Sequence, residues 1–125
     1  MGVRVVLVED NDVFRETLEL LLGLRGDLEI VASVASGQEA IEVCAKLDPD
    51  VVLVDYRMPG LNGAQTTAEV LLASPRSRVL CLTASISHEE MDSLIEAGAL
   101  ACLTKDEDLE HIVASIHSAA AAAAA

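Results

Sequence analysis

Several short apolar runs of this chain end at polar side chains that could bind a cation or a phosphoryl group. Glu9 and Asp10 follow one run, and Asp55, Thr83 and Lys105 follow three others. The three carboxylates suit a hard cation such as Mg²⁺, whereas the hydroxyl and the ammonium suit an oxyanion. If the runs are parallel strands, all these side chains lie at one edge of one sheet, where open α/β sheets bind their ligands.

The elements that must position these residues alternate along the chain. Runs rich in Val, Leu and Ile predict strands, and the segments between them repeat apolar residues at helical spacing. The predicted strands are Val3–Val8, Glu29–Val34, Val51–Val54, Arg78–Leu82 and Leu100–Leu103. This alternation predicts an α/β fold with a doubly wound five-stranded parallel sheet of order 2-1-3-4-5. In that order the first and third strands are neighbours, which places Glu9 and Asp10 beside Asp55.

Capping residues predict where several helices begin. Ser and Asn are favoured N-caps, and a Glu three residues later completes a capping box. The predicted boxes are Ser36 with Glu39 and Ser87 with Glu90, and the further predicted N-caps are Asn62 and Asp106.

Composition restricts the classes of partner. The chain has 125 residues, which suits one domain, and a formal net charge of −13, which would repel the phosphates of nucleic acids. We therefore do not expect this segment to bind DNA by itself. No run approaches the length of a membrane span, and Cys44, Cys81 and Cys102 form no C-x-x-C pair, so reduced thiols and a cytoplasmic location are expected.

The acidic residues admit two interpretations. As an isolated cluster, the segment from Glu9 to Asp12 would be a solvated loop and helix cap. Its expected proximity to Asp55 and Lys105 favours a chemical role instead. A carboxylate beside Mg²⁺ is a competent nucleophile toward phosphoryl groups, and Lys105 and Thr83 could bind phosphoryl oxygens.

These motifs together resemble the response-regulator receiver domain of two-component signalling over residues 3 to 117. The resemblance rests on Val8-Glu9-Asp10, on Val54 to Gly63 (VDYRMPGLNG), on Leu82-Thr83-Ala84 and on Leu103-Thr104-Lys105-Asp106. It implies that Asp55 accepts a phosphoryl group from a histidine kinase. It also implies that Asp10 ligates Mg²⁺, that Glu9 supports the ion, and that the Arg57 backbone carbonyl is a further ligand.

The stretch from Glu29 to Glu42 (EIVASVASGQEAIE) is most similar to the nitrate-response and quorum-sensing (LuxR-type) group. Receivers of that group precede a helix-turn-helix DNA-binding domain, which is not recognisable in this sequence. The resemblance implies control of such a domain and homodimerisation through the last helices and strand. The expected domains are a receiver over 1–118 and an alanine tail over 119–125, which is a helix extension or an added or unassigned end.

One residue departs from the family pattern. Three residues before the lysine the family usually carries Tyr or Phe, and this chain has Cys102. We expect Cys102 to be a small, at least half-buried hydrophobe, which puts signalling through an aromatic ring in question. The expected partner-binding face is the loop from Ala84 to Ser87 with the helix near His88 to Glu96, and its predicted neighbours are Leu100, Cys102 and Ile112.

Rival functions come from other classes. A flavodoxin-like redox carrier would need a first loop that cradles phosphate, and the acids from Glu9 to Asp12 would repel one. An aspartyl-phosphate phosphatase commonly has an acid two residues after its nucleophile, where this chain has Arg57. A phosphorylation-independent interaction module would retain only the fold, and it stays as the second interpretation.

Overall fold

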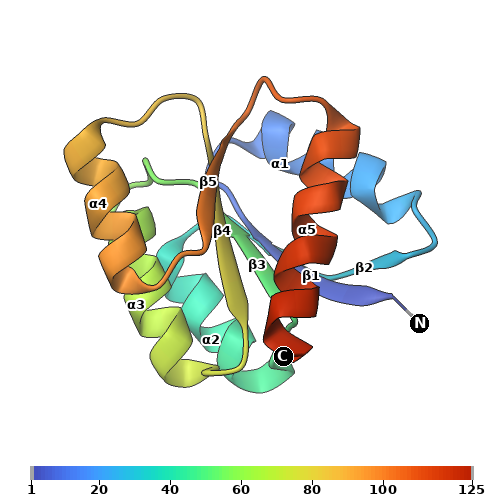
Figure 1. The fold of residues 1–125 in the computed structure, drawn as a ribbon, viewed down its shortest axis with the longest axis horizontal. Helices are drawn as coiled ribbons and strands as arrows, with labels where there is room; N and C mark the ends of the chain where they lie inside the picture. The colour runs from blue at the N-terminus through green and yellow to red at the C-terminus, as the bar shows by residue number, and fades with distance from the viewer. Residues whose placement is uncertain (1, 125) are drawn as a thin grey trace.

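A computed structural model, which describes residues 2–124, shows strands and helices in strict alternation (Figure 1). The strands are β1 (Val3–Val8), β2 (Leu28–Val34), β3 (Val51–Val54), β4 (Arg78–Thr83) and β5 (Ala101–Thr104). The helices are α1 (Asp12–Gly23), α2 (Gly37–Leu47), α3 (Gly63–Ala73), α4 (His88–Ala97) and α5 (Leu109–Ala124). The strands form one parallel sheet of order β2-β1-β3-β4-β5, which confirms the predicted topology.

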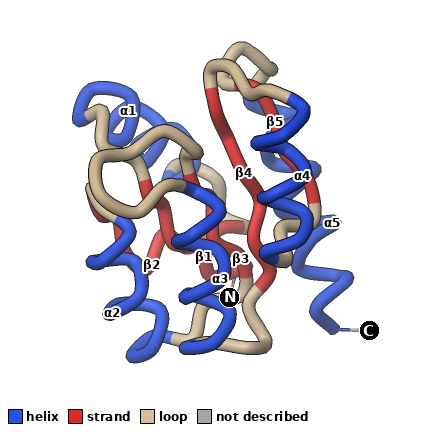
Figure 2. Tube along the Cα trace, turned by 90° about the vertical axis from the view of Figure 1, so that its left-hand side faces the viewer, coloured by secondary structure: helices blue, strands red, loops and turns tan. Residues whose placement is uncertain are grey.

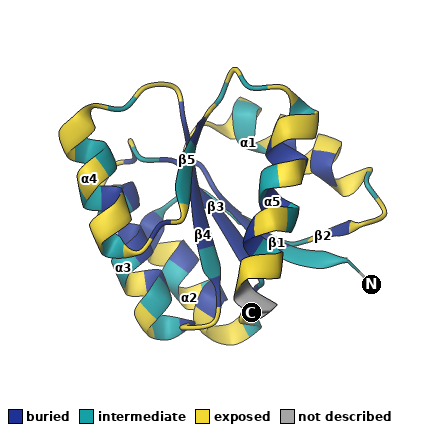
Figure 3. Ribbon diagram, in the orientation of Figure 1, coloured by how far each residue is buried: buried dark blue, intermediate teal, exposed yellow. Residues whose placement is uncertain are grey.

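The sheet separates two hydrophobic layers. Val5 and Leu7 of β1 pack with residues of α1 and α5, whereas Val6 and Val8 pack with residues of α2, α3 and α4. Figure 2 shows α2, α3 and α4 along one side of the sheet, and Figure 3 shows its central strands as buried. A strand covered on both faces must be apolar at consecutive positions, which explains the continuous Val and Leu runs.

Backbone hydrogen bonds extend beyond the ends of the strands and position the polar residues there. The Glu9 amide donates to the Val34 carbonyl, and the Asp55 amide donates to the Val8 carbonyl, each at 3.0 Å. The Lys105 amide donates to the Thr83 carbonyl, also at 3.0 Å. The sheet therefore fixes the backbone of Glu9, Asp55 and Lys105 at one edge.

Three of the predicted N-caps are confirmed. Ser87 and Glu90 form a reciprocal capping box at the start of α4, and Asn62 forms one with Gln65 at the start of α3. Ser36 caps α2 by accepting the Glu39 amide.

Two capping predictions are corrected. The Glu39 carboxylate accepts from the Ala35 amide instead of from the N-cap amide, so the box at α2 is not reciprocal. The prediction that Asp106 caps the last helix was wrong, because the Asp108 carboxylate accepts the His111 amide at 2.8 Å. Asp106 instead accepts a hydrogen bond from the Thr104 hydroxyl within the preceding turn.

The predicted partner-binding face also needs a correction. Leu100 lies just before β5 and is 47% exposed, but Ile112 is only 3% exposed and belongs to the core beneath α5. Ile112 is therefore a core residue and not an exposed neighbour of that face. Helix α5 continues without a break through the alanine segment to Ala124. Within residues 2–124, no helix is long and apolar enough to span a membrane.

Candidate functional site

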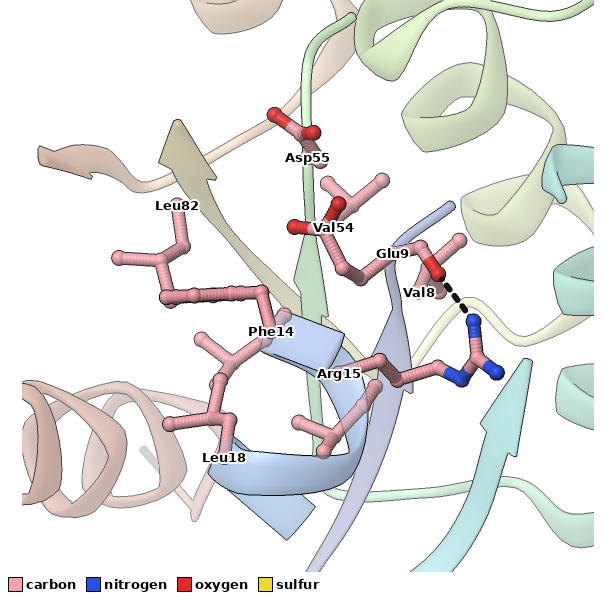
Figure 4. Close-up of a pocket in the computed structure, with 10 residues that line it drawn as sticks. Val8, Glu9, Phe14, Arg15, Leu18, Val54, Asp55 and Leu82 are labelled. Atoms are coloured by element: carbon pink, nitrogen blue, oxygen red, sulfur yellow. Dashed lines mark hydrogen bonds between the residues drawn. The ribbon is translucent and has the colours of Figure 1, made fainter. Parts of the chain in front are cut away.

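The acidic cluster predicted from the sequence forms at the carboxyl edge of the sheet. One carboxylate oxygen from each of Glu9, Asp10 and Asp55 lies within 4.8 Å of the others. Glu9 and Asp55 are 5% and 6% exposed, while Asp10 is open to solvent. Figure 4 shows Glu9 and Asp55 together at the top of a small pocket beneath the site.

Both oxygens of the Glu9 carboxylate have partners in the protein. Oε1 lies 2.7 Å from the Lys105 ammonium, and Oε2 accepts the Asn11 amide at 3.0 Å. The Arg15 guanidinium donates to the Glu9 backbone carbonyl at 2.8 Å (Figure 4). Burial raises the pKa of Glu9, and the negative charge of Asp55 adds to this effect, although Lys105 opposes it. These contacts fix the Glu9 carboxylate on the buried side of the site.

Lys105 bridges the two buried carboxylates. Its Nζ lies 2.7 Å from Glu9 Oε1 and 3.3 Å from Asp55 Oδ2. Burial by itself lowers the pKa of Lys105, but the hydrogen bond to Glu9 and the charges of both carboxylates raise it overall. Its ammonium also lies over the Phe14 ring, 4.6 Å from the centroid. Lys105 is therefore a charged, partly desolvated group pointing into the acidic cluster.

The loop after β3 packs closely against the start of α3. A Cβ atom on Gly63 would lie 2.7 Å from Tyr56 Cα and 2.8 Å from the Asp55 carbonyl oxygen, so this approach requires glycine. The Gly63 amide donates to the Tyr56 carbonyl at 2.8 Å, and Gly60 turns the loop with a φ of 78°. These contacts fix the backbone that carries Asp55.

Thr83 lies at the predicted edge of the sheet, but its hydroxyl donates to a residue that is close in the chain. It is the last residue of β4, is 1% exposed, and donates to the Ser85 carbonyl at 3.3 Å. The structure therefore brings Glu9, Asp10, Asp55 and Lys105 together, while the Thr83 hydroxyl bonds within the loop that leads to α4.

Arg57 makes a contact that the sequence interpretation missed. Its guanidinium pairs with the Glu90 carboxylate of α4 through two contacts, of 2.8 and 2.9 Å. The spacing of the two residues along the chain carries no signal for this pair. The role of the Arg57 backbone carbonyl as a metal ligand stays a prediction.

Cys102 lies opposite Cys81 in the register of β5 with β4. Cys81 is buried and Cys102 is half-buried, and both thiols are free. Burial raises the pKa of Cys102, which disfavours the reactive thiolate. These observations agree with the expected role of a small hydrophobe at the place of the family's aromatic residue.

The donor set fits Mg²⁺. Three clustered carboxylates offer hard oxygen ligands, and the exposure of Asp10 leaves one side of the cluster open to the waters that Mg²⁺ usually retains. If the ion binds, Asp10 and Asp55 would be the direct ligands and Glu9, already bonded to Lys105, would support it.

The comparisons with known proteins agree with this arrangement. The response regulator receiver domain family matches residues 5–117, so the chain belongs to that family. Among curated relatives, it is 36% identical over 114 residues to the transcriptional regulatory protein LnrK of Bacillus subtilis, covering 91% of this chain and 52% of that protein. It is 30% identical over 117 residues to the nitrate/nitrite response regulator protein NarL of Escherichia coli, covering 94% of this chain and 54% of that protein. The chain thus spans about half the length of these relatives.

Solved structures show the same fold. The signal receiver domain of the putative response regulator NarL from Mycobacterium tuberculosis superposes with a TM-score of 0.89 at 36% identity, covering 96% of this chain and 97% of that one. The response regulator domain of CheB from Thermotoga maritima has a TM-score of 0.87 at 24% identity, covering 97% and 98%, and supports the fold alone. The resemblance to LuxR-type regulators is confirmed by LnrK, by the two NarL proteins and by a LuxR-family structure from Aurantimonas, which has a TM-score of 0.90 at 28% identity.

Proposed function

We propose that this chain accepts a phosphoryl group on Asp55 from a histidine kinase, with Mg²⁺, and switches a partner-binding surface in response. The observation that supports this most is the buried Asp55 carboxylate, held 3.3 Å from the Lys105 ammonium inside a carboxylate cluster. In the transfer, an Asp55 oxygen bonds to phosphorus as the bond from phosphorus to the kinase histidine nitrogen breaks and the imidazole leaves with the electron pair. Bound Mg²⁺ would supply charge neutralisation for the phosphoryl oxygens.

The protein residues then have separate tasks. Lys105 already points into the cluster and would pair with one phosphoryl oxygen. The Thr83 hydroxyl would bind another oxygen after leaving the Ser85 carbonyl, which moves the loop before α4. This chemistry is stoichiometric self-modification and self-hydrolysis, which suits a regulatory domain instead of a metabolic enzyme.

The relatives support a downstream role. LnrK is named as a transcriptional regulatory protein, and both LnrK and the Escherichia coli NarL are about twice as long as the match, so we propose that this receiver controls a helix-turn-helix DNA-binding domain. The five helices between residues 2 and 124 all belong to the receiver fold. We place its activity in the cytoplasm, with a second copy of the chain as a partner through the last helices and strand.

The test is a Mg²⁺-dependent acyl phosphate at Asp55. Incubation with acetyl phosphate should add one phosphoryl group by intact mass, and hydroxylamine should remove it. Asp55→Asn should abolish the addition, and Asp12→Asn, an exposed acid on α1, should retain it. Failure to form an adduct with acetyl phosphate and with beryllium fluoride would favour the phosphorylation-independent interaction module. Release of many phosphates per chain from phosphate esters would favour the phosphatase.

A further inference from the structure

A bidentate ion pair joins the loop after β3 to helix α4. Arg57 Nη1 lies 2.9 Å from Glu90 Oε2, and Arg57 Nη2 lies 2.8 Å from Glu90 Oε1. Two parallel contacts between a guanidinium and a carboxylate fix orientation as well as distance. The Glu90 side chain is 23% exposed and the Arg57 side chain 54%, so the pair lies at the surface, and Arg57 follows Asp55 by two residues along the chain.

Glu90 also holds the first turn of α4. Its Oε1 accepts the Ser87 amide at 2.9 Å, and its own amide donates to the Ser87 hydroxyl at 3.1 Å. The hydrogen bond from the Ser87 amide and the bonds from Arg57 both lower the pKa of Glu90, which keeps it ionised at neutral pH. A displacement of Arg57 would therefore act directly on the start of the helix.

Helix α4 has little else to anchor it. Leu94 is the one buried side chain among the described residues of α4, whereas α3 buries Gly63, Thr66, Thr67 and Val70. Elements with few buried contacts open at low free energy. The position of α4 should therefore respond to a single ion pair more than the position of α3 would.

We propose that the Arg57–Glu90 pair, here named the α4 clasp, couples the phosphoacceptor loop to α4 by exchanging partners. This inference rests on the proposed function of Asp55. A phosphoryl group on Asp55, two residues before Arg57, competes with Glu90 for the guanidinium, because Arg pairs with phosphate as readily as with carboxylate. Release of Glu90 then loosens the first turn of α4. The opening of the clasp is a discrete change of contacts. It could replace the movement of the aromatic ring that most receivers have at the position of Cys102, because a thiol is too small for such a movement.

Hydrogen exchange at the amides of residues 88–97 tests the clasp. Exchange is compared with EDTA and with Mg²⁺ plus beryllium fluoride, and fluorine NMR reports separately whether the adduct has formed. In the native chain the adduct should raise exchange in α4 by about two- to fivefold, the range expected for loss of one surface ion pair. In Glu90→Gln, exchange in α4 should already be raised to a similar extent without the adduct. Formation of the adduct should then raise that exchange only a little further.

The variants separate the clasp from helix capping. Gln at position 90 retains an amide oxygen that can accept the Ser87 amide, so the cap survives while the charge is lost. Arg57→Gln should reproduce the effect of Glu90→Gln without adduct, and the double variant should exceed neither single one. Glu89→Gln removes a neighbouring exposed acid in the same turn, which costs the same favourable interaction with the helix dipole but no ion pair with Arg57, so it should raise exchange less than Glu90→Gln does.

Three results would overturn the clasp. An adduct visible by fluorine NMR with unchanged exchange in α4 would do so while leaving the proposed function intact. Equal exchange in the native chain and Glu90→Gln without adduct would show that the pair does not hold α4. If no fluorine signal of a bound adduct appears, the result contradicts both the proposed phosphorylation of Asp55 and the proposed transfer of Arg57 from Glu90 to the phosphoryl group.

Discussion

The Lys105 ammonium lies 4.6 Å from the centroid of the Phe14 ring while it contacts the Glu9 carboxylate at 2.7 Å. Helix α1 thereby provides an aromatic surface for the cation that, under the proposed function, pairs with a phosphoryl oxygen. Phe14 does not occupy the place of Cys102, but it contacts the same lysine-centred cluster.

The first prediction is that Phe14 stabilises the position of Lys105. Phe14→Leu should lose the cation–π contact, and a double-mutant cycle with Lys105→Met should give a coupling free energy of about 0.5–1 kcal/mol. Urea unfolding of the four proteins measures it. Phe14→Tyr retains a ring and should retain most of the coupling.

Because the chain has a single Phe, one set of ring resonances should also shift when the phosphoryl mimic is added.

The second prediction concerns metal affinity. We expect Mg²⁺ to bind weakly without a phosphoryl group, because Glu9 is already engaged by Lys105 and few carboxylates remain as direct ligands. Asp10→Asn should weaken Mg²⁺ binding by on the order of tenfold, since the charge of the ligands sets the affinity. NMR titration with Mg²⁺ alone provides the measurement, with Asp12→Asn as the matched control. Unchanged affinity in Asp10→Asn would remove Asp10 from the site.

The third prediction concerns crowding of negative charge. The buried oxygens of Glu9 and Asp55 lie in one cluster with the exposed Asp10, and Lys105 lies nearer to Glu9 than to Asp55. Asp55→Asn should therefore stabilise the fold by about 1 kcal/mol at low Mg²⁺. Denaturant unfolding in EDTA measures the gain, and added Mg²⁺ should reduce it. A loss of stability in EDTA would mean that the ion pair with Lys105 outweighs the repulsion.

The fourth prediction is a pH dependence from Glu9. Because the folded protein raises the pKa of Glu9 above its ordinary 4.5, the folded state binds this proton more tightly than the unfolded chain. The stabilisation that Glu9 provides by holding this proton should therefore be present near pH 4.5. It should be lost as pH rises through the raised pKa of Glu9. Each unit of difference between the folded and unfolded pKa corresponds to about 1.4 kcal/mol.

The comparison that isolates this effect is the native chain against Glu9→Gln. Urea unfolding in EDTA at several values between pH 4.5 and 7.5 should show the native chain gaining stability relative to Glu9→Gln as pH falls. A constant difference across that range would show that Glu9 titrates as it does in the unfolded chain.

The fifth prediction concerns Cys102. A ring that changes position gives a receiver two discrete arrangements, and a thiol is too small to do so. Cys102→Tyr should make phosphoryl-dependent dimerisation steeper while leaving acceptance of phosphate at Asp55 nearly unchanged. Analytical ultracentrifugation of both proteins, each fully modified, tests this. Cys102→Ala should behave as the native chain does, and an equally strong shift in native and Tyr variants would show that no ring is needed.

Much of the fold could be predicted because its signals are local. Strands β1 and β3 have the bounds that the apolar runs indicated. The fully buried positions of both strands are all apolar, and the one polar residue, Arg4, lies in the half-buried first part of β1. The ends of β4 and β5 each extend one residue further than predicted, because Thr83 and Thr104 still join the ladder despite their hydroxyls. Residue type alone cannot show whether a threonine at the end of a strand pairs with the neighbouring strand or belongs to the following turn.

The last helix cap shows the limit of local patterns. Asp106, Glu107 and Asp108 are neighbouring acids, and each is a plausible group near a helix N-terminus. The turn after Lys105 decides between them, because Asp106 accepts from Thr104 and leaves Asp108 to cap α5.

The order of residue types along the chain fixes which side chains reach the carboxyl edge of the sheet. Glu9, Asp10, Asp55 and Lys105 follow buried strands, and parallel order brings such positions together. The contacts that these side chains make there are set by the packing of the helices. The placement of Phe14 over Lys105 and the pairing of Arg57 with Glu90 depend on how helices pack against the sheet, and that packing orients side chains from distant parts of the chain.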